Sequence, residues 1–125
     1  MASQRIGSAA YAVLYAVAGS LLAAGTGFVL ESNFRRGLSD RELAPLVERA
    51  RAIFVRCTVP DTERWRRYAE RVRHPGHFDA ALLAAWEADI AIFDPPDIDG
   101  LTLIDADGTM PVAAGVARVV QALPR

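Results

Sequence analysis

The stretch from Ile6 to Leu30 is 25 residues long and contains no charged side chain. A stretch this apolar is expected to be buried in a protein core, or else to act as a membrane anchor or a signal peptide. Gly25-Thr26-Gly27 interrupts the run and predicts two pieces, an alanine-rich helix over Ser8–Ala24 and a short buried strand over Phe28–Leu30. Neither piece alone would span a bilayer core of about 30 Å. We therefore expect a helix of a globular core and no membrane partner.

The remainder of the chain alternates helical and strand patterns. Ser39 and Glu42 have the spacing of a capping box, which predicts the start of a helix that runs to about Arg51. Further strands are predicted at 52–57 and 101–104, and further helices after Pro60, after Asp79 and over 112–123. Strands separated by helices indicate an α/β fold with a parallel sheet of three strands, in one domain over residues 1–125.

Charge and cysteine content narrow the class of protein. The net charge is −1, so the chain as a whole is not a generic nucleic-acid binder, and we expect no nucleic-acid partner. The single cysteine, Cys57, forms no intrachain disulfide, which fits a cytoplasmic protein. No histidine stands beside it in sequence, so it is not expected to be a nucleophile.

All 14 basic residues are arginines, and nine of them lie between Arg41 and Arg73. Arg64, Arg67 and Arg71 are spaced to share one helix face. Guanidinium groups bind phosphate oxygens and offset charge on a transferred phosphoryl group. The alternative is a solvated helix whose arginines pair with Glu63 and Glu70.

His74-Pro75-Gly76-His77 follows these arginines directly and has the stiff, glycine-hinged character of a mobile lid. A histidine pair could also bind a metal, but carboxylates would have to complete that site, so no metal is expected. The segment 61–79 is therefore predicted to be a lid.

Phe28 to Arg36 reads FVLESNFRR, an apolar strand that ends in polar residues. Ligands gather at the carboxyl edge of parallel sheets. Glu31 could orient a magnesium-bound water or a reacting hydroxyl, and Asn33 and Arg35 could contact substrate. An ordinary strand-to-helix loop is the alternative.

The sequence Asp105-Ala106-Asp107-Gly108 resembles the start of a calcium loop. Val116 stands where such a loop needs its bidentate acid, so a turn is predicted instead.

Taken together, several segments resemble the P-loop kinase-like ATPases of the zeta-toxin and chloramphenicol-phosphotransferase type, often described as AAA-family ATP-binding proteins. These segments are AYAVLYAVAGSLLAAG, FVLESNFRR, FVRC, RYAERVRHPGHFD and LTLIDADG. The resemblance implies a three-layer P-loop NTPase-like fold. It also implies ATP and Mg²⁺ as cofactors and transfer of phosphate to a small-molecule or nucleotide acceptor. Arg67, Arg71 and Arg73 would be lid arginines, and His74 and His77 would bind substrate beside them. Glu31 would be the acid of the magnesium-associated strand, and Asp105 and Asp107 would be neighbours of the adenine.

The family also has a first central strand and a GxxxxGK[ST] loop, which this lysine-free sequence lacks. We therefore expect an N-terminally truncated portion of such a kinase, carrying the lid and the substrate side and inactive alone. An uncovered sheet edge would permit self-association. The alternative is a non-catalytic module whose arginine face binds a phosphate-bearing ligand or a protein.

Overall fold

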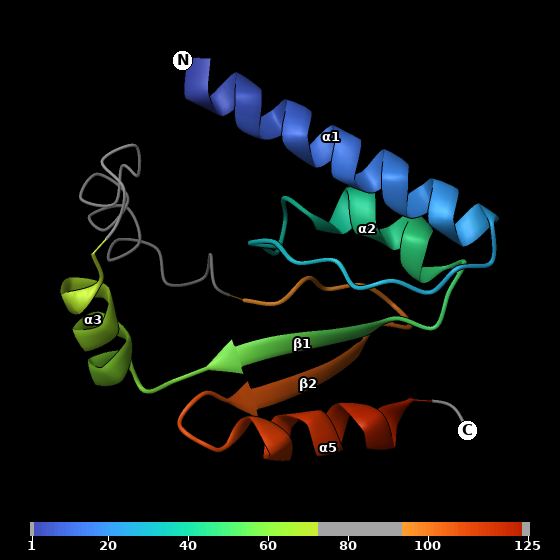
Figure 1. Ribbon diagram of the computed structural model, residues 1–125. Helices are drawn as coiled ribbons and strands as arrows, with labels where there is room; N and C mark the ends of the chain where they lie inside the picture. The colour runs from blue at the N-terminus through green and yellow to red at the C-terminus, as the bar shows by residue number, and fades with distance from the viewer. Residues whose placement is uncertain (1, 73–93, 124–125) are drawn as a thin grey trace. The chain divides into compact units, whose positions relative to one another are not determined.

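The computed structural model describes the backbone of residues 2–72 and 94–123 and the side chains from Gly7 onward within them. This part of the chain is α/β, with a two-stranded parallel sheet and four helices (Figure 1). The residues form two compact units, Met1–Ala52 with Pro95–Leu101 and Ile53–Asp94 with Thr102–Arg125. The elements in order are α1 (Ala2–Ala23), α2 (Asp40–Val47), β1 (Ile53–Thr58), α3 (Asp61–Glu70), β2 (Thr102–Asp107) and α5 (Val112–Ala122).

The first unit is built on α1, which packs against α2. α1 begins at Ala2, one and a half turns before the predicted start at Ser8. Its end is as predicted: Gly25 has a left-handed φ of 70°, and its N–H donates to the carbonyl of Leu22 over 3.0 Å. The N–H of Thr26 donates to the carbonyl of Leu21 over 2.9 Å, which completes a Schellman motif.

The start of α2 differs from the predicted capping box. Ser39 is the N-cap residue, but its side chain does not cap the helix. Its hydroxyl instead accepts a hydrogen bond from the backbone N–H of Arg35 over 3.0 Å, and the serine is only 5% exposed. The hydroxyl therefore stabilises the turn before α2 rather than the first turn of the helix. α2 ends at Val47, short of the expected Arg51, and contains Pro45.

The predicted strand at Phe28–Leu30 is wrong. These residues do not form a β-strand. Val29 was expected to be covered on both faces, but it is 93% exposed. Phe28 and Leu30 are half-buried, so the segment has the alternating burial of an extended chain. A strand needs a hydrogen-bonding neighbour, and no described segment pairs with this one.

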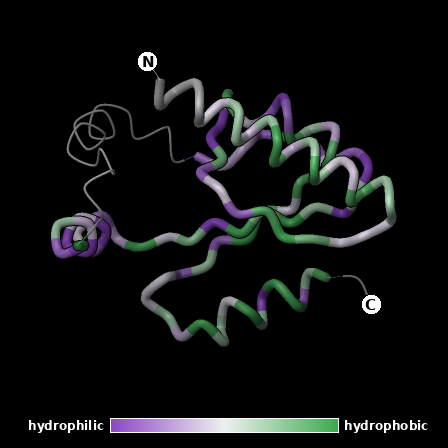
Figure 2. Tube along the Cα trace, turned by 45° about the horizontal axis from the view of Figure 1, so that its top comes forward, coloured by the Kyte–Doolittle hydropathy of each residue, from purple (hydrophilic) through white to green (hydrophobic). Residues whose placement is uncertain are grey.

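The second unit contains the sheet. β1 and β2 are parallel, and Val55 pairs with Ile104 in their register. α5 packs on both strands, and a Cβ on its Gly115 would lie 3.8 Å from the Cβ of Ala106. Ile104 is buried on this covered face. Figure 2 shows α3 as a largely hydrophilic helix.

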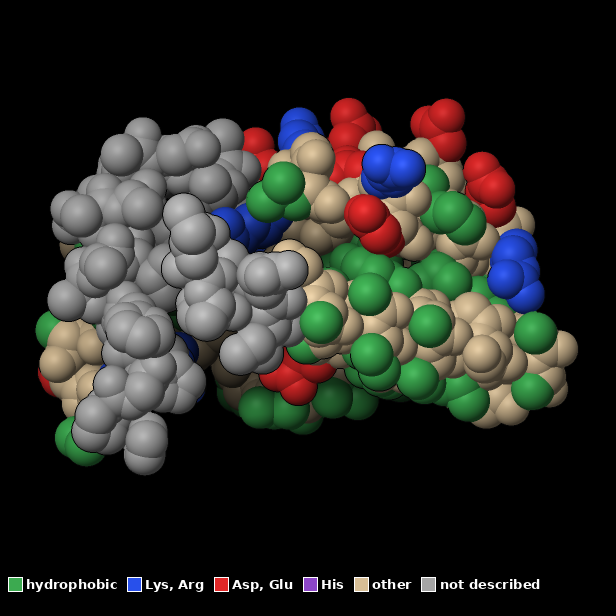
Figure 3. Space-filling model, turned by 90° about the horizontal axis from the view of Figure 1, so that it is seen from above, with side chains coloured by type: hydrophobic (Ala, Val, Ile, Leu, Met, Phe, Trp, Pro, Cys, Tyr) green, Lys and Arg blue, Asp and Glu red, His purple; other side chains and the backbone are tan. Residues whose placement is uncertain are grey.

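Apolar side chains also lie on the outer surface of α1 (Figure 3), where Val13 is 63% and Val17 is 52% exposed. Within residues whose placement is described, no helix combines the length and the hydropathy needed to cross a membrane.

Candidate functional site

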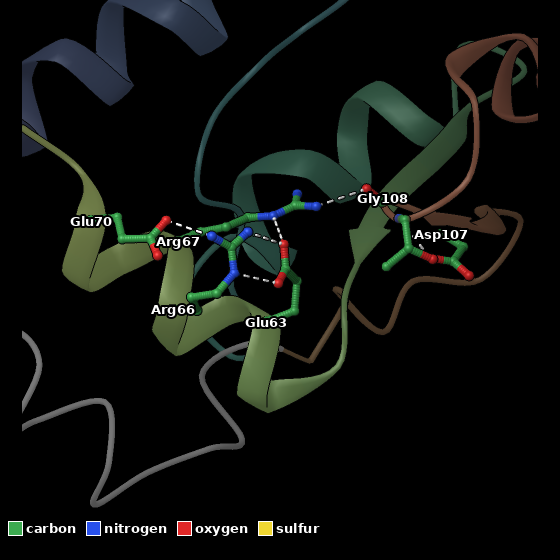
Figure 4. A network of polar contacts seen from close by, with 7 residues as sticks. Glu63, Arg66, Arg67, Glu70, Asp107 and Gly108 are labelled. Carbon is green, nitrogen blue, oxygen red and sulfur yellow. Dashed lines mark hydrogen bonds and ion pairs between the residues drawn. The ribbon is translucent and has the colours of Figure 1, made fainter.

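The arginines of α3 are paired with acids of the same helix (Figure 4). Arg66 donates to Glu63 through Nε and Nη2, both over 2.8 Å, and to Glu70 through Nη1 over 2.5 Å. Hydrogen bonds from Arg66 and, to a smaller extent, from Arg67 lower the pKa of the Glu63 carboxyl to about 2. Hydrogen bonds to Glu63 and Glu70 in turn raise the pKa of Arg66. The alternative interpretation, a solvated helix whose arginines pair with Glu63 and Glu70, thus accounts for much of the charge on α3.

Arg67 connects α3 to the turn after β2. Its Nε lies 2.5 Å from Oε1 of Glu63, and its Nη2 donates to the carbonyl of Gly108 over 3.2 Å. The second contact brings a predicted lid arginine beside the predicted nucleotide-binding turn. The Arg67 side chain is half exposed, so an anionic ligand could displace Glu63 from its guanidinium group.

The two carboxylates of β2 that were predicted to lie near the nucleotide are already engaged by the protein. Asp105 accepts hydrogen bonds from Nε and Nη2 of Arg56, over 2.7 and 2.9 Å. The hydrogen bonds from Arg56 lower the pKa of Asp105, and Arg118 also donates to the Asp105 carbonyl. Sequence reasoning missed this pair, although an arginine and an acid on two successive strands were a usable signal.

The predicted turn at 105–108 starts later than expected, because Asp105, Ala106 and Asp107 belong to β2, and Asp107 ends the strand. Oδ1 of Asp107 accepts hydrogen bonds from the N–H of Thr109 over 2.8 Å and from the Thr109 hydroxyl over 2.7 Å. These bonds lower the pKa of Asp107. Gly108 then donates its N–H to the carbonyl of Thr58 over 2.7 Å, which fixes the turn against the end of β1.

In the first unit, Asn33 and Arg35 line a cavity of about 730 Å³. The remaining wall comes from α1, from the segment before α2 and from α2 itself. Glu31 does not line this cavity. The structure therefore brings two of the four predicted substrate residues into one wall, while His74 and His77 lie outside the described residues. The lining residues are Gly7, Ser8, Tyr11, Ala12, Tyr15, Asn33, Arg35, Leu38, Ser39 and Glu42.

Two tyrosines of α1 form one side of this cavity. The rings of Tyr11 and Tyr15 stack with centroids 6.1 Å apart. The Tyr11 hydroxyl accepts a hydrogen bond from Ser32 over 2.8 Å, which ties the segment carrying Asn33 to α1. Burial raises the pKa of Tyr15, opposed by a hydrogen bond with Ser39 and assisted by the charge of Glu42. Tyr11 and Tyr15 stand one turn apart in an otherwise apolar helix, and this spacing could have indicated them from the sequence.

Comparisons with protein-family models, curated proteins and solved structures found no match to this chain.

Arg71 is the residue that ends α3, and its backbone there is extended. Arg73, His74 and His77 lie outside the described residues. Among the residues that are described, no group of three or more His, Cys, Asp or Glu side chains could hold a metal ion. The cavity of the first unit thus offers the most developed binding chemistry in the described part of the chain: a guanidinium, an amide, a carboxylate and two aromatic rings.

Proposed function

We propose that this chain is the lid and substrate-side portion of an ATP-dependent phosphotransferase, and that the cavity lined by Asn33 and Arg35 binds the phosphate acceptor. The observation that carries the proposal is the joint placement of these two residues in the wall of one cavity. Both were assigned to substrate from the sequence alone.

The size and lining of the cavity support a small-molecule acceptor. Its volume of about 730 Å³ falls within the range of about 300–1,000 Å³ typical of small-molecule sites. Such sites combine apolar and aromatic walls with a few polar groups that fix orientation. Tyr11 and Tyr15 provide the aromatic part, while Asn33 and Arg35 provide hydrogen-bond donors.

The lid half of the proposal is supported by the exposed arginines of α3. Arg67 and Arg71 are assigned to the phosphates, with Arg73, His74 and His77 continuing the lid, in a three-layer P-loop-like fold. Glu31 is assigned to the magnesium-bound water. ATP would supply the phosphoryl group and Mg²⁺ would offset its charge. Because the chain has no lysine to hold the β- and γ-phosphates, it is expected to turn over no ATP by itself.

The acceptor half can be tested by NMR titration of the ¹⁵N-labelled chain with a panel of hydroxylated small molecules. We expect saturable shifts at backbone amides of the cavity wall, including Tyr11, Asn33 and Arg35. Arg35→Ala should weaken binding about tenfold, the effect of removing a hydrogen bond to a charged group. Arg41→Ala, on the exposed surface of α2 and outside the cavity, is the matched control and should bind as the unaltered chain does. Shifts confined to α3, or equal effects of both variants, would contradict the assignment.

The second candidate is a non-catalytic module that binds a phosphate-bearing ligand. It is favoured by the half-exposed guanidinium groups of Arg66 and Arg67, which a polyphosphate could reach. Titration with tripolyphosphate distinguishes the two. The module predicts saturable binding that Arg67→Ala weakens, without any small-molecule acceptor bound in the first unit.

A further inference from the structure

The cavity of the first unit contains two opposite charges that form no ion pair within the described part of the chain. Arg35 and Glu42 both line it, and neither forms an ion pair with any residue of 7–72 or 94–123. In α3, by contrast, Arg66 is paired with two acids. The charges in the cavity are therefore available to a ligand.

Several other polar groups of the cavity wall already have partners in the protein. The Tyr11 hydroxyl accepts a hydrogen bond from Ser32 and donates one to the carbonyl of Asn33. The Ser39 hydroxyl also accepts the N–H of Arg35. The wall thus presents one guanidinium, one carboxylate and the Asn33 amide to a ligand, next to two stacked aromatic rings. A ligand that satisfies it needs an anionic group, a cationic group and an apolar or planar body.

Resting on the acceptor site proposed above, we propose that the occupant is a small zwitterion with an ammonium group, a carboxylate and an aromatic body whose hydroxyl accepts the phosphoryl group, the chemical class of the hydroxylated aromatic amino acids. Arg35 binds the carboxylate through paired N–H donors, and Glu42 accepts from the ammonium group. Tyr11 and Tyr15 lie against the aromatic body. A carboxylate fits better than a phosphate dianion, because Arg35 and Glu42 carry one charge each and a dianion would leave a negative charge unbalanced.

The test compares three ligands with the same ring, measured by NMR titration of the full ¹⁵N-labelled chain. L-Phenylalanine carries both charges, 3-phenylpropionate only the anion and 2-phenylethylamine only the cation. We expect L-phenylalanine to bind about tenfold more tightly than either analogue, since each lost contact involves a charged group. With Glu42→Gln, L-phenylalanine and 3-phenylpropionate should bind alike. With Arg35→Gln, L-phenylalanine and 2-phenylethylamine should bind alike.

Arg41→Gln serves as the control and should preserve the order of the three ligands. The dispersion of each variant's spectrum shows whether it folds, and the ligand comparison on the unaltered chain does not depend on any variant. Equal binding of the three ligands would overturn the zwitterion and leave the acceptor cavity standing. Absence of binding by all three, with binding of a neutral hydroxylated molecule in the same cavity, would do the same. If no small molecule binds the cavity, both proposals are wrong.

Discussion

Arg56 and Asp105 stand opposite each other in the register of β1 and β2 and are joined by two hydrogen bonds of 2.7 and 2.9 Å. The pair fixes a guanidinium–carboxylate fork on one face of the sheet, while α5 packs against the other, where Ile104 and Ala106 lie. The carboxylate that resembled a nucleotide contact therefore has a structural partner.

Breaking this pair should have a small effect. The Arg56 side chain is 32% exposed and that of Asp105 is 45% exposed, so a double-mutant cycle of Arg56→Ala and Asp105→Ala should give a coupling of about 0.5–1 kcal/mol. The hydrogen bonds from Arg56 hold the pKa of Asp105 below its usual value. The coupling should thus be complete above the unfolded-state pKa and vanish as the pH falls through the folded-state pKa. Urea denaturation at several pH values measures it, and a coupling that persisted at the lowest pH would contradict this assignment.

The Glu63 carboxylate should titrate unusually low. Its pKa of about 2 lies below the ordinary value of 4.5 because Arg66 and Arg67 donate to it. Replacing both arginines with alanine should return the pKa toward 4.5, followed by the ¹³C shift of the carboxyl group during an acid titration. Since the folded-state pKa is depressed, the stabilisation is present above pH 4.5 and is lost as the pH falls toward 2. A Glu63 pKa near 4.5 in the unaltered chain would show that these hydrogen bonds do not form in solution.

The turn after β2 should not tolerate a side chain at Gly108. A Cβ there would lie 2.9 Å from Cγ1 of Val59 and 3.4 Å from the carbonyl of Thr58. Val59 is β-branched and rotates poorly, so Gly108→Ala should destabilise the chain by about 1–3 kcal/mol. Gly19→Ala within α1 is the control, because its Cβ would meet nothing within 4 Å and alanine favours a helix by about 1 kcal/mol. Thermal denaturation should show opposite shifts for the two variants, and shifts in the same direction would be inconsistent with the packing of the turn.

Tyr15 should resist ionisation at alkaline pH. Burial raises its pKa above the ordinary value of 10.0. The folded state holds the phenol proton more strongly than the unfolded state, so this stabilisation is lost as the pH rises from 10.0 through the folded-state pKa. The difference in tyrosinate absorbance between the unaltered chain and Tyr15→Phe isolates this group. Ionisation at the unfolded-state pKa would mean that Tyr15 is not buried in the wall of the cavity.

The sequence predicted those parts of the fold that depend on local chemistry. Gly25 ends α1 because glycine adopts a left-handed φ without strain, and the apolar run AIFVRC forms β1. The fate of Phe28–Leu30 was not predictable, since a strand exists only where another segment supplies its hydrogen bonds. The same holds for the hydroxyl of Ser39, whose partner is the backbone of Arg35 and not that of its own helix.

The candidate site was predicted only in part, because its wall also depends on contacts between segments that are distant in sequence. A polar crest after an apolar run located Asn33 and Arg35, but the crest cannot indicate which side chains of α1 and α2 complete the wall. Tyr11, Tyr15 and Glu42 enter the cavity only through the packing of α1 and α2. The roles of Arg67 and Asp105 depended on neighbours, Glu63 and Arg56, whose pairing the sequence alone left undecided.

The central claim is that the cavity of the first unit binds a small molecule, and intermolecular nuclear Overhauser effects test it most directly. With a small molecule bound at saturation to the ¹⁵N,¹³C-labelled chain, either L-phenylalanine or a hydroxylated molecule from the panel, we predict contacts from the ligand to the ring protons of Tyr11 and Tyr15. Contacts from the ligand only to residues outside the cavity, or no contacts at saturation, would contradict the account.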